Sequence, residues 1–186
     1  FVNGGKLISP IIIDRIQDSE GNTIINNENR KCSNCEKISF TGKDYPVIED
    51  NYEQIMSEQT AYQITSFLEG VVKRGTGKKL KELKLNLAGK TGTTNENTDA
   101  WFVGFTSDLV IGVYVGMDNP RPLGKFETGS KAALPIFKEF VEKAIKKSDA
   151  RPFKVPKNMT LMVIDPLTGE KAKFNSKNTI IEAYKS

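Results

Sequence analysis

The fold is decided by the stretch Leu85-Asn86-Leu87-Ala88-Gly89-Lys90-Thr91-Gly92-Thr93 and by the two apolar runs that follow it, 100–106 and 109–117. Residues 85–88 alternate between apolar and polar positions as a half-buried strand does, and they lead directly into the glycine-containing part of the stretch. The residues Ser107-Asp108 separate the two apolar runs, and a two-residue loop between such runs is typical of a β-hairpin. We therefore expect strands that pair as an antiparallel sheet.

Helices are predicted on both sides of these strands in the chain. Ser57 can cap a helix that ends at Gly75 and Gly77, with one apolar face formed by Ala61, Ile64, Leu68 and Val71. A second helix is predicted over 129–147, with an apolar stripe formed by Ala133, Phe137, Phe140, Val141 and Ala144. The run 109–117 is apolar on both faces, which predicts cover on each side. The fold class expected is α+β, an antiparallel sheet backed by helices.

Two regions differ in character from this core. Residues 26–51 are polar and irregular, as in a surface excursion. Beyond Arg151-Pro152 the sequence predicts an extended unit at 160–164, a turn at 165–169 and a polar tail. We therefore predict a division into residues 1–150, part of one domain, and residues 151–186, a C-terminal extension.

Composition excludes several classes of function. The 186 residues contain no histidine, which excludes within them a Ser-His-Asp triad, a histidine base and a His-ligated metal. The 27 basic and 23 acidic residues leave a net charge of only +4, which argues against nucleic-acid binding. No apolar run approaches the roughly 18 residues of a membrane span. The sequence begins at Phe1 in mid-pattern, so we expect a piece of a longer protein.

The residues Gly89-Lys90-Thr91 match the end of a phosphate-binding loop, but the first glycine of that motif is replaced by Lys84 and no helix follows. A strand glycine instead allows an extended peptide to pair alongside. Thr91 and Thr93 place two hydroxyls on one face, and Lys90 adds a cation nearby. This set suits a peptide carboxylate.

Four longer motifs carry a resemblance to a known family. They are Ala88-Gly89-Lys90-Thr91-Gly92-Thr93-Thr94-Asn95, Asp99-Ala100-Trp101-Phe102-Val103-Gly104-Phe105, Val113-Tyr114-Val115-Gly116-Met117-Asp118 and Gly129-Ser130-Lys131-Ala132-Ala133. Over roughly residues 1–145 the chain resembles the class A penicillin-binding proteins, whose third motif is Lys-Thr-Gly. The resemblance implies an incomplete penicillin-binding or β-lactamase-like transpeptidase domain.

The resemblance also implies roles for the residues of the third motif. Lys90 would sit in the hydrogen-bond network of the active site, and the backbone N–H of Thr93 would donate to the oxyanion. Thr91, Gly92 and Thr93 would bind substrate, with the two hydroxyls on the terminal carboxylate of a D-Ala-D-Ala stem peptide or of a β-lactam. The parent protein would be a bifunctional peptidoglycan synthase, a serine-type transpeptidase with a glycosyltransferase. It would act without a cofactor at the periplasmic face of the inner membrane, with its anchor outside this chain.

The sequence departs from the family in one decisive respect. No serine has a lysine three positions later, so the Ser-x-x-Lys nucleophile and base are missing, and the second motif is missing before Lys90. The match Ser176-Lys177-Asn178 lies in the polar tail and is taken as coincidence. The isolated chain is therefore expected to be inactive and, without the family's central helices, to expose apolar surface and self-associate. The alternative is a non-catalytic periplasmic module that binds peptides or acts as a scaffold.

Cys32 and Cys35 form a Cys-x-x-Cys pair inside the excursion. Two thiolates supply half of a zinc site, and no second cysteine pair or histidine completes it, so no metal is expected. A thioredoxin-like role would place the pair at the start of a helix after a strand, which its flanking residues do not suggest. The oxidising compartment implied by the resemblance favours a local disulfide.

Overall fold

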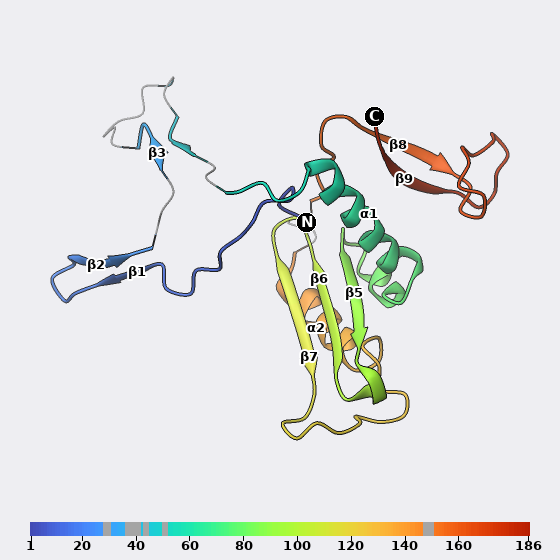
Figure 1. Ribbon diagram of the computed structural model, residues 1–186, viewed down its shortest axis with the longest axis horizontal. Helices are drawn as coiled ribbons and strands as arrows, with labels where there is room; N and C mark the ends of the chain where they lie inside the picture. The colour runs from blue at the N-terminus through green and yellow to red at the C-terminus, as the bar shows by residue number, and fades with distance from the viewer. Residues whose placement is uncertain (28–30, 36–41, 43–44, 50–51, 147–150) are drawn as a thin grey trace. The chain divides into compact units, whose positions relative to one another are not determined.

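The computed structural model describes residues 1–27, 31–35, 42, 45–49, 52–146 and 151–186 (Figure 1). The chain divides into two compact units, one made of Phe1–Gly5 with Met56–Ser186 and the other of Lys6–Ile55. The first unit contains the sheet and both long helices. The division expected between residues 150 and 151 stays a prediction.

The first unit is built on a three-stranded antiparallel sheet in the order β5-β6-β7. The strands are β5 (Ala88–Thr93), β6 (Ala100–Phe105) and β7 (Val110–Val115). The predicted hairpin is confirmed. Strand β5 begins at Ala88, later than the alternation at Leu85 predicts, because its pairing partner β6 ends at Phe105, opposite Ala88.

Helix α2 (Ala133–Ala144) packs against β6 and β7 and covers one face of the sheet, behind the strands in Figure 1. Its Phe137 ring meets Phe102 of β6 edge to face, with centroids 4.6 Å apart. The helix is shorter than the predicted 129–147 because residues 129–132 form turns before it. Phe140, predicted to be core, is 49% exposed. The α+β fold class is confirmed.

Helix α1 (Glu58–Arg74) packs beside β5 and begins as predicted. The Ser57 hydroxyl accepts the Thr60 N–H at 3.2 Å, and the N–H of Gly75 closes the last turn on the Val71 carbonyl at 3.0 Å. Its fully buried positions are Ala61, Thr65, Gly70 and Val72, whereas Ile64, Leu68 and Val71 of the predicted face are half-buried. The buried face is rotated because the helix contacts both β5 and β9.

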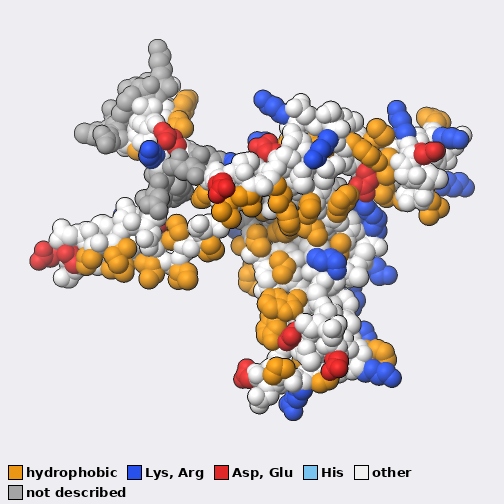
Figure 2. Space-filling view, in the orientation of Figure 1, with side chains coloured by type: hydrophobic (Ala, Val, Ile, Leu, Met, Phe, Trp, Pro, Cys, Tyr) orange, Lys and Arg blue, Asp and Glu red, His pale blue; other side chains and the backbone are white. Residues whose placement is uncertain are grey.

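One face of β7 is open, contrary to the expectation that both faces of residues 109–117 are covered, although Phe105 on the same face of the sheet is buried against Phe153. Ile111, Val113 and Val115 pack toward the α2 core. On the opposite face, four side chains are between 42% and 61% exposed: Trp101, Val103, Val110 and Tyr114. We call these four residues the open sheet face; hydrophobic side chains are visible over this part of the sheet in Figure 2.

The C-terminal residues form a second antiparallel pair, β8 (Met159–Ile164) with β9 (Ile180–Lys185). The predicted polar tail is therefore wrong at its end, where β9 pairs along the whole of β8. The hairpin docks on α1 through Gln63, whose side-chain N–H donates to the Ala183 carbonyl at 3.0 Å, and through Lys185, which donates to the Thr60 hydroxyl at 2.8 Å. The partner strand comes ten or more residues after the turn, a separation that local patterning does not reveal.

The second unit contains two short pairs, β1 (Arg15–Gln17) with β2 (Thr23–Asn26), and β3 (Cys32–Ser33) with β4 (Val47–Ile48). Every described residue between 7 and 55 is exposed, as a surface excursion over 26–51 would require, and that excursion stays a prediction. The Cα atoms of Cys32 and Cys35 lie 5.7 Å apart, within the span of a disulfide. The predicted disulfide remains to be tested by thiol titration.

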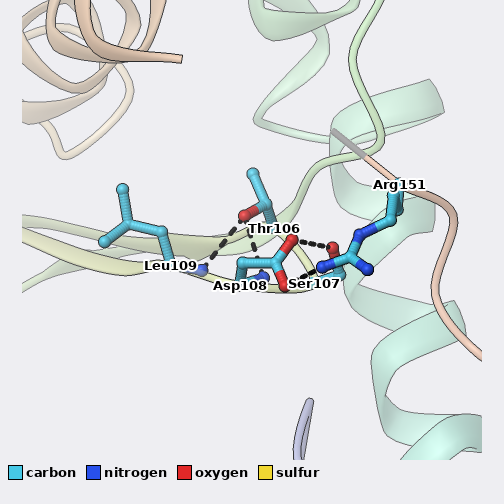
Figure 3. A network of polar contacts seen from close by, with 5 residues as sticks. All are labelled: Thr106, Ser107, Asp108, Leu109 and Arg151. Carbon is cyan, nitrogen blue, oxygen red and sulfur yellow. Dashed lines mark hydrogen bonds and ion pairs between the residues drawn. The ribbon is translucent and has the colours of Figure 1, made fainter. Parts of the chain in front are cut away.

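The turn between β6 and β7 is held by a polar network (Figure 3). The Thr106 hydroxyl accepts the backbone N–H groups of Asp108 and Leu109 at 3.2 and 3.1 Å. The Asp108 carboxylate accepts the Ser107 hydroxyl and the Arg151 guanidinium, each at 2.7 Å. The hydrogen bond from Ser107, followed by the charge of Arg151, lowers the pKa of Asp108 from its usual 3.8.

A lowered pKa in the folded chain predicts a pH-dependent contribution to stability. The contribution of Asp108 is complete above its unfolded pKa of 3.8 and is lost as the pH falls through the lower folded value. Asp108→Asn should therefore flatten the acid side of the stability curve while Glu170→Gln, a change outside the network, leaves it unaltered. Urea unfolding between pH 2 and pH 6 measures this; identical acid slopes for Asp108→Asn and the unmodified chain would contradict it.

Candidate active site

The residues predicted to bind a peptide carboxylate lie on β5, at the edge of the sheet. Among the residues the structure describes, β5 pairs only with β6, and no strand occupies its other edge. Just beyond the strand, the N–H of Thr94 donates to the Asp99 carbonyl on the β6 side at 3.1 Å. Because successive N–H groups of a strand point in opposite directions, the N–H of Thr93 points toward the unpaired edge.

Lys90 and Thr91 meet on this strand. The Lys90 ammonium donates to the Thr91 carbonyl at 2.8 Å and lies 3.4 Å from the Thr91 hydroxyl. Lys90 is exposed, and no carboxylate pairs with it among the described residues. An unpaired cation beside a hydroxyl can attract and bind an anionic group.

The Thr93 hydroxyl is positioned by the loop that precedes α2. Its oxygen accepts the backbone N–H of Gly129 at 3.0 Å. A hydroxyl that accepts one hydrogen bond keeps its own hydrogen to donate. Thr93 can therefore be held by Gly129 and still donate to a carboxylate.

Thr76, from the turn after α1, is a site residue that the sequence did not single out. Its hydroxyl lies 2.9 Å from the Thr91 hydroxyl, across fifteen residues of chain. Thr76 therefore adds a further hydroxyl beside that of Thr91 at the edge of β5. No local spacing signals this contact, because it depends on how α1 packs beside the strand.

The open sheet face adjoins the same strand. In the register of the sheet Lys90 lies opposite Val103, and Gly92 opposite Trp101, whose ring contacts the Tyr114 ring at a tilt of 47° with centroids 4.7 Å apart. The Tyr114 hydroxyl donates to Asp99 at 2.8 Å, and this hydrogen bond is the main cause of a raised pKa for Tyr114. An aromatic wall therefore flanks the strand on this face.

The structure thus brings Lys90 and Thr91 into contact on β5, while Thr93, two residues further along the same strand, is held by Gly129. A cation, two hydroxyls and an outward N–H along an extended edge can hold the carboxylate and backbone of an extended peptide. The described residues include no helix long and apolar enough to span a membrane. The catalytic and substrate-binding roles of Lys90, Thr91, Gly92 and Thr93 stay predictions.

Comparisons with known proteins identify the family of this chain. The family described as "Penicillin binding protein transpeptidase domain" matches residues 1–142. Penicillin-binding protein 1A of Rickettsia felis is 42% identical over the whole chain, and that of Pseudomonas aeruginosa is 32% identical over the whole chain. The chain spans 23% and 26% of the lengths of these two relatives.

A solved structure also matches the fold of this chain. The crystal structure of penicillin-binding protein 1A from Haemophilus influenzae superposes with a TM-score of 0.75 at 26% identity, covering 97% of this chain and 30% of that one. The family match extends over most of the chain and includes β5, β6, β7 and nearly all of α2. The chain belongs to the penicillin-binding protein transpeptidase family, and its relatives are of the 1A type.

Proposed function

We propose that this chain supplies the peptide-binding strand of a serine-type D-Ala-D-Ala transpeptidase. The observation that carries the proposal is the edge of β5, where the Lys90 ammonium lies 3.4 Å from the Thr91 hydroxyl and Gly129 holds the Thr93 hydroxyl at 3.0 Å. A stem peptide aligned along this edge would place its terminal carboxylate on the two hydroxyls, with the charge of Lys90 nearby. β-Lactams would present their carboxylate in the same way.

In this proposal the acyl-transfer step uses the outward N–H of Thr93. A serine oxygen attacks the carbonyl carbon of the penultimate D-Ala, and negative charge develops on the carbonyl oxygen. The Thr93 N–H donates to that oxygen as one of the two oxyanion donors, a type of interaction worth roughly 3 kcal/mol. The bond to the terminal D-Ala then breaks, leaving an acyl-serine for the amine of a second stem peptide.

The nucleophile of this step is not among these 186 residues, since no serine is followed by lysine at the third position. We therefore propose that the whole protein provides it from another segment. That protein would be a bifunctional synthase, with a glycosyltransferase, acting at the periplasmic face of the inner membrane. The proposal draws on the family and on the 1A-type relatives, of which this chain spans about a quarter.

Labelling with a fluorescent penicillin tests whether the nucleophile lies outside this chain. The isolated chain should form no covalent adduct, because acylation needs an activated nucleophile. The whole protein should be labelled at one serine per molecule, and unlabelled penicillin should block the labelling. Intact-mass analysis reads both results. A stoichiometric adduct on the isolated chain would show that the nucleophile lies among these residues and would refute the assignment.

We also propose that the isolated chain self-associates through the open sheet face. Trp101, Val103, Val110 and Tyr114 are each at least 42% exposed and lie on adjacent strands. Val103→Lys together with Val110→Lys should reduce the average mass measured by light scattering. Ile12→Lys, at a side chain 98% exposed in the other unit, is the matched control. A monomer at millimolar concentration that binds no hydrophobic dye would contradict the proposal.

A further inference from the structure

A second concave site lies on the first unit, among residues that take no part in the β5 edge. A groove of about 630 Å³ is bounded by the C-terminal half of α1, the segment that leads from residue 81 into β5, and the start of β9. Its apolar floor is formed by the half-buried Leu85 and Ile180, which lie over the core residues Val72 and Leu87. Its volume is in the range of sites that bind small molecules or peptide side chains.

The rim of this groove is strongly basic. Its lining includes four cations, Lys73, Arg74, Lys81 and Lys84, and a single carboxylate, Glu69. Two of the cations are paired, since Lys73 contacts Glu69 at 3.1 Å and Arg74 contacts Glu182 of β9 at 2.9 Å.

The other two cations lie on the 3₁₀ helix η1 (Lys78–Leu83) and at its C-cap. Lys81 and Lys84 are exposed, and neither forms an ion pair within the described part of the chain. The groove therefore presents two unneutralised positive charges beside an apolar floor.

A glycine on α1 shapes one wall. A Cβ at Gly70 would come within 2.9 Å of the Arg74 guanidinium, so the missing side chain lets Arg74 lie back along the helix toward Glu182. Ile181, which follows Ile180 on the same wall, is 61% exposed. The wall thus combines an ordered ion pair with an uncovered apolar side chain.

We propose that this groove binds an acidic peptide segment of a partner protein, with an apolar side chain on the floor and carboxylates beside Lys81 and Lys84. The two exposed lysines favour an anionic ligand, and the apolar side chains of Leu85, Ile180 and Ile181 beside them favour a peptide over a nucleic acid, whose phosphates need only a basic surface. A concave site suits an extended peptide better than a flat lipid surface. The proposal is independent of the function assigned to β5.

Fluorescence anisotropy with a labelled Glu-Leu-Glu-Leu-Asp-Leu peptide tests the charges, using the full chain at low salt. The double variant Lys81→Glu with Lys84→Glu should weaken binding at least tenfold, equivalent to about 1.4 kcal/mol. The matched control is Lys78→Glu with Lys79→Glu, on the same helix η1 but outside the groove, which should change binding less than twofold. The neutral peptide Gln-Leu-Gln-Leu-Asn-Leu should bind at least tenfold more weakly.

The apolar side chains that line the groove are tested separately, at the exposed Ile181 of the β9 wall. Ile181→Ser should weaken binding severalfold, whereas Leu161→Ser, an exposed position on β8 outside the groove, should not. Circular dichroism checks that each variant keeps the helicity of the unmodified chain. Equal losses for the two lysine pairs, or tight binding of the neutral peptide, would overturn the proposal. So would binding to phosphatidylglycerol vesicles that depends on Lys81 and Lys84 when the acidic peptide does not bind.

Discussion

Thr93→Val and Lys90→Ala each slow the acylation of the whole protein by penicillin by about ten- to a hundredfold, if the edge of β5 holds the substrate carboxylate. A hydrogen bond to a charged group contributes roughly 1.5–3 kcal/mol, and each 1.4 kcal/mol corresponds to about a tenfold change in rate. Valine removes the hydroxyl of Thr93 and keeps its backbone N–H. Alanine removes the unpaired cation that lies 3.4 Å from the Thr91 hydroxyl.

Conservative variants separate this role from a structural one. Thr93→Ser keeps the hydroxyl that accepts the Gly129 N–H and should retain most of the acylation rate. Thr93→Val also loses that acceptor, so its melting temperature is measured together with its rate. Stopped-flow labelling gives the acylation rate at saturating penicillin and the concentration for half-saturation. Unchanged acylation by both Thr93→Val and Lys90→Ala would show that β5 is not the substrate-binding strand.

Gly129→Ala should destabilise the first unit by about 3 kcal/mol, the upper part of the range for overpacking. A Cβ at residue 129 would meet the carbonyl oxygens of Trp101 and Gly92, the latter at 2.5 Å. These are backbone atoms of β5 and β6, which cannot move aside without opening the sheet. The same shift would pull the Gly129 N–H away from Thr93.

Gly112→Ala is the matched control for this prediction. Gly112 lies in the middle of β7, and a Cβ there would have nothing within 4 Å, so alanine should change stability by less than about 0.5 kcal/mol. Urea unfolding monitored by the fluorescence of Trp101 compares the two variants. Equal midpoints for Gly129→Ala and Gly112→Ala would mean that the loop before α2 does not pack tightly on the sheet.

Local patterns were sufficient for the order of α1, the three strands of the sheet and α2. The Ser57 cap, the helix end at Gly75 and the hairpin around Ser107-Asp108 all depend on residues within a few positions of one another. Local patterns were not sufficient to predict which face of β7 is buried and which is exposed. Alternation in 109–117 shows that both faces of β7 are apolar, but only the packing of α2 determines which one is buried.

In the candidate site, too, some residues could be predicted from local sequence and others could not. The residue types and order of Lys90-Thr91-Gly92-Thr93 were enough to predict a carboxylate-binding strand, and the longer motifs around them suggested the family. Thr76 and Gly129 were not assigned to the site, because they reach Thr91 and Thr93 across fifteen and thirty-six residues of chain. Spacing along the chain carries no signal for such contacts.

The sequence by itself determined the secondary structure around the sheet, the third-motif residues and the absence of histidine and Ser-x-x-Lys chemistry from these residues, because each depends on residue identity and short-range periodicity. The tertiary structure alone decided that one face of β7 stays open, that β9 returns to pair with β8, and that Gly129 holds Thr93. It also decided that α1, the segment before β5 and β9 enclose a basic groove. These features arise from contacts between distant segments, and their energies are set by packing after the chain has folded rather than by local preference.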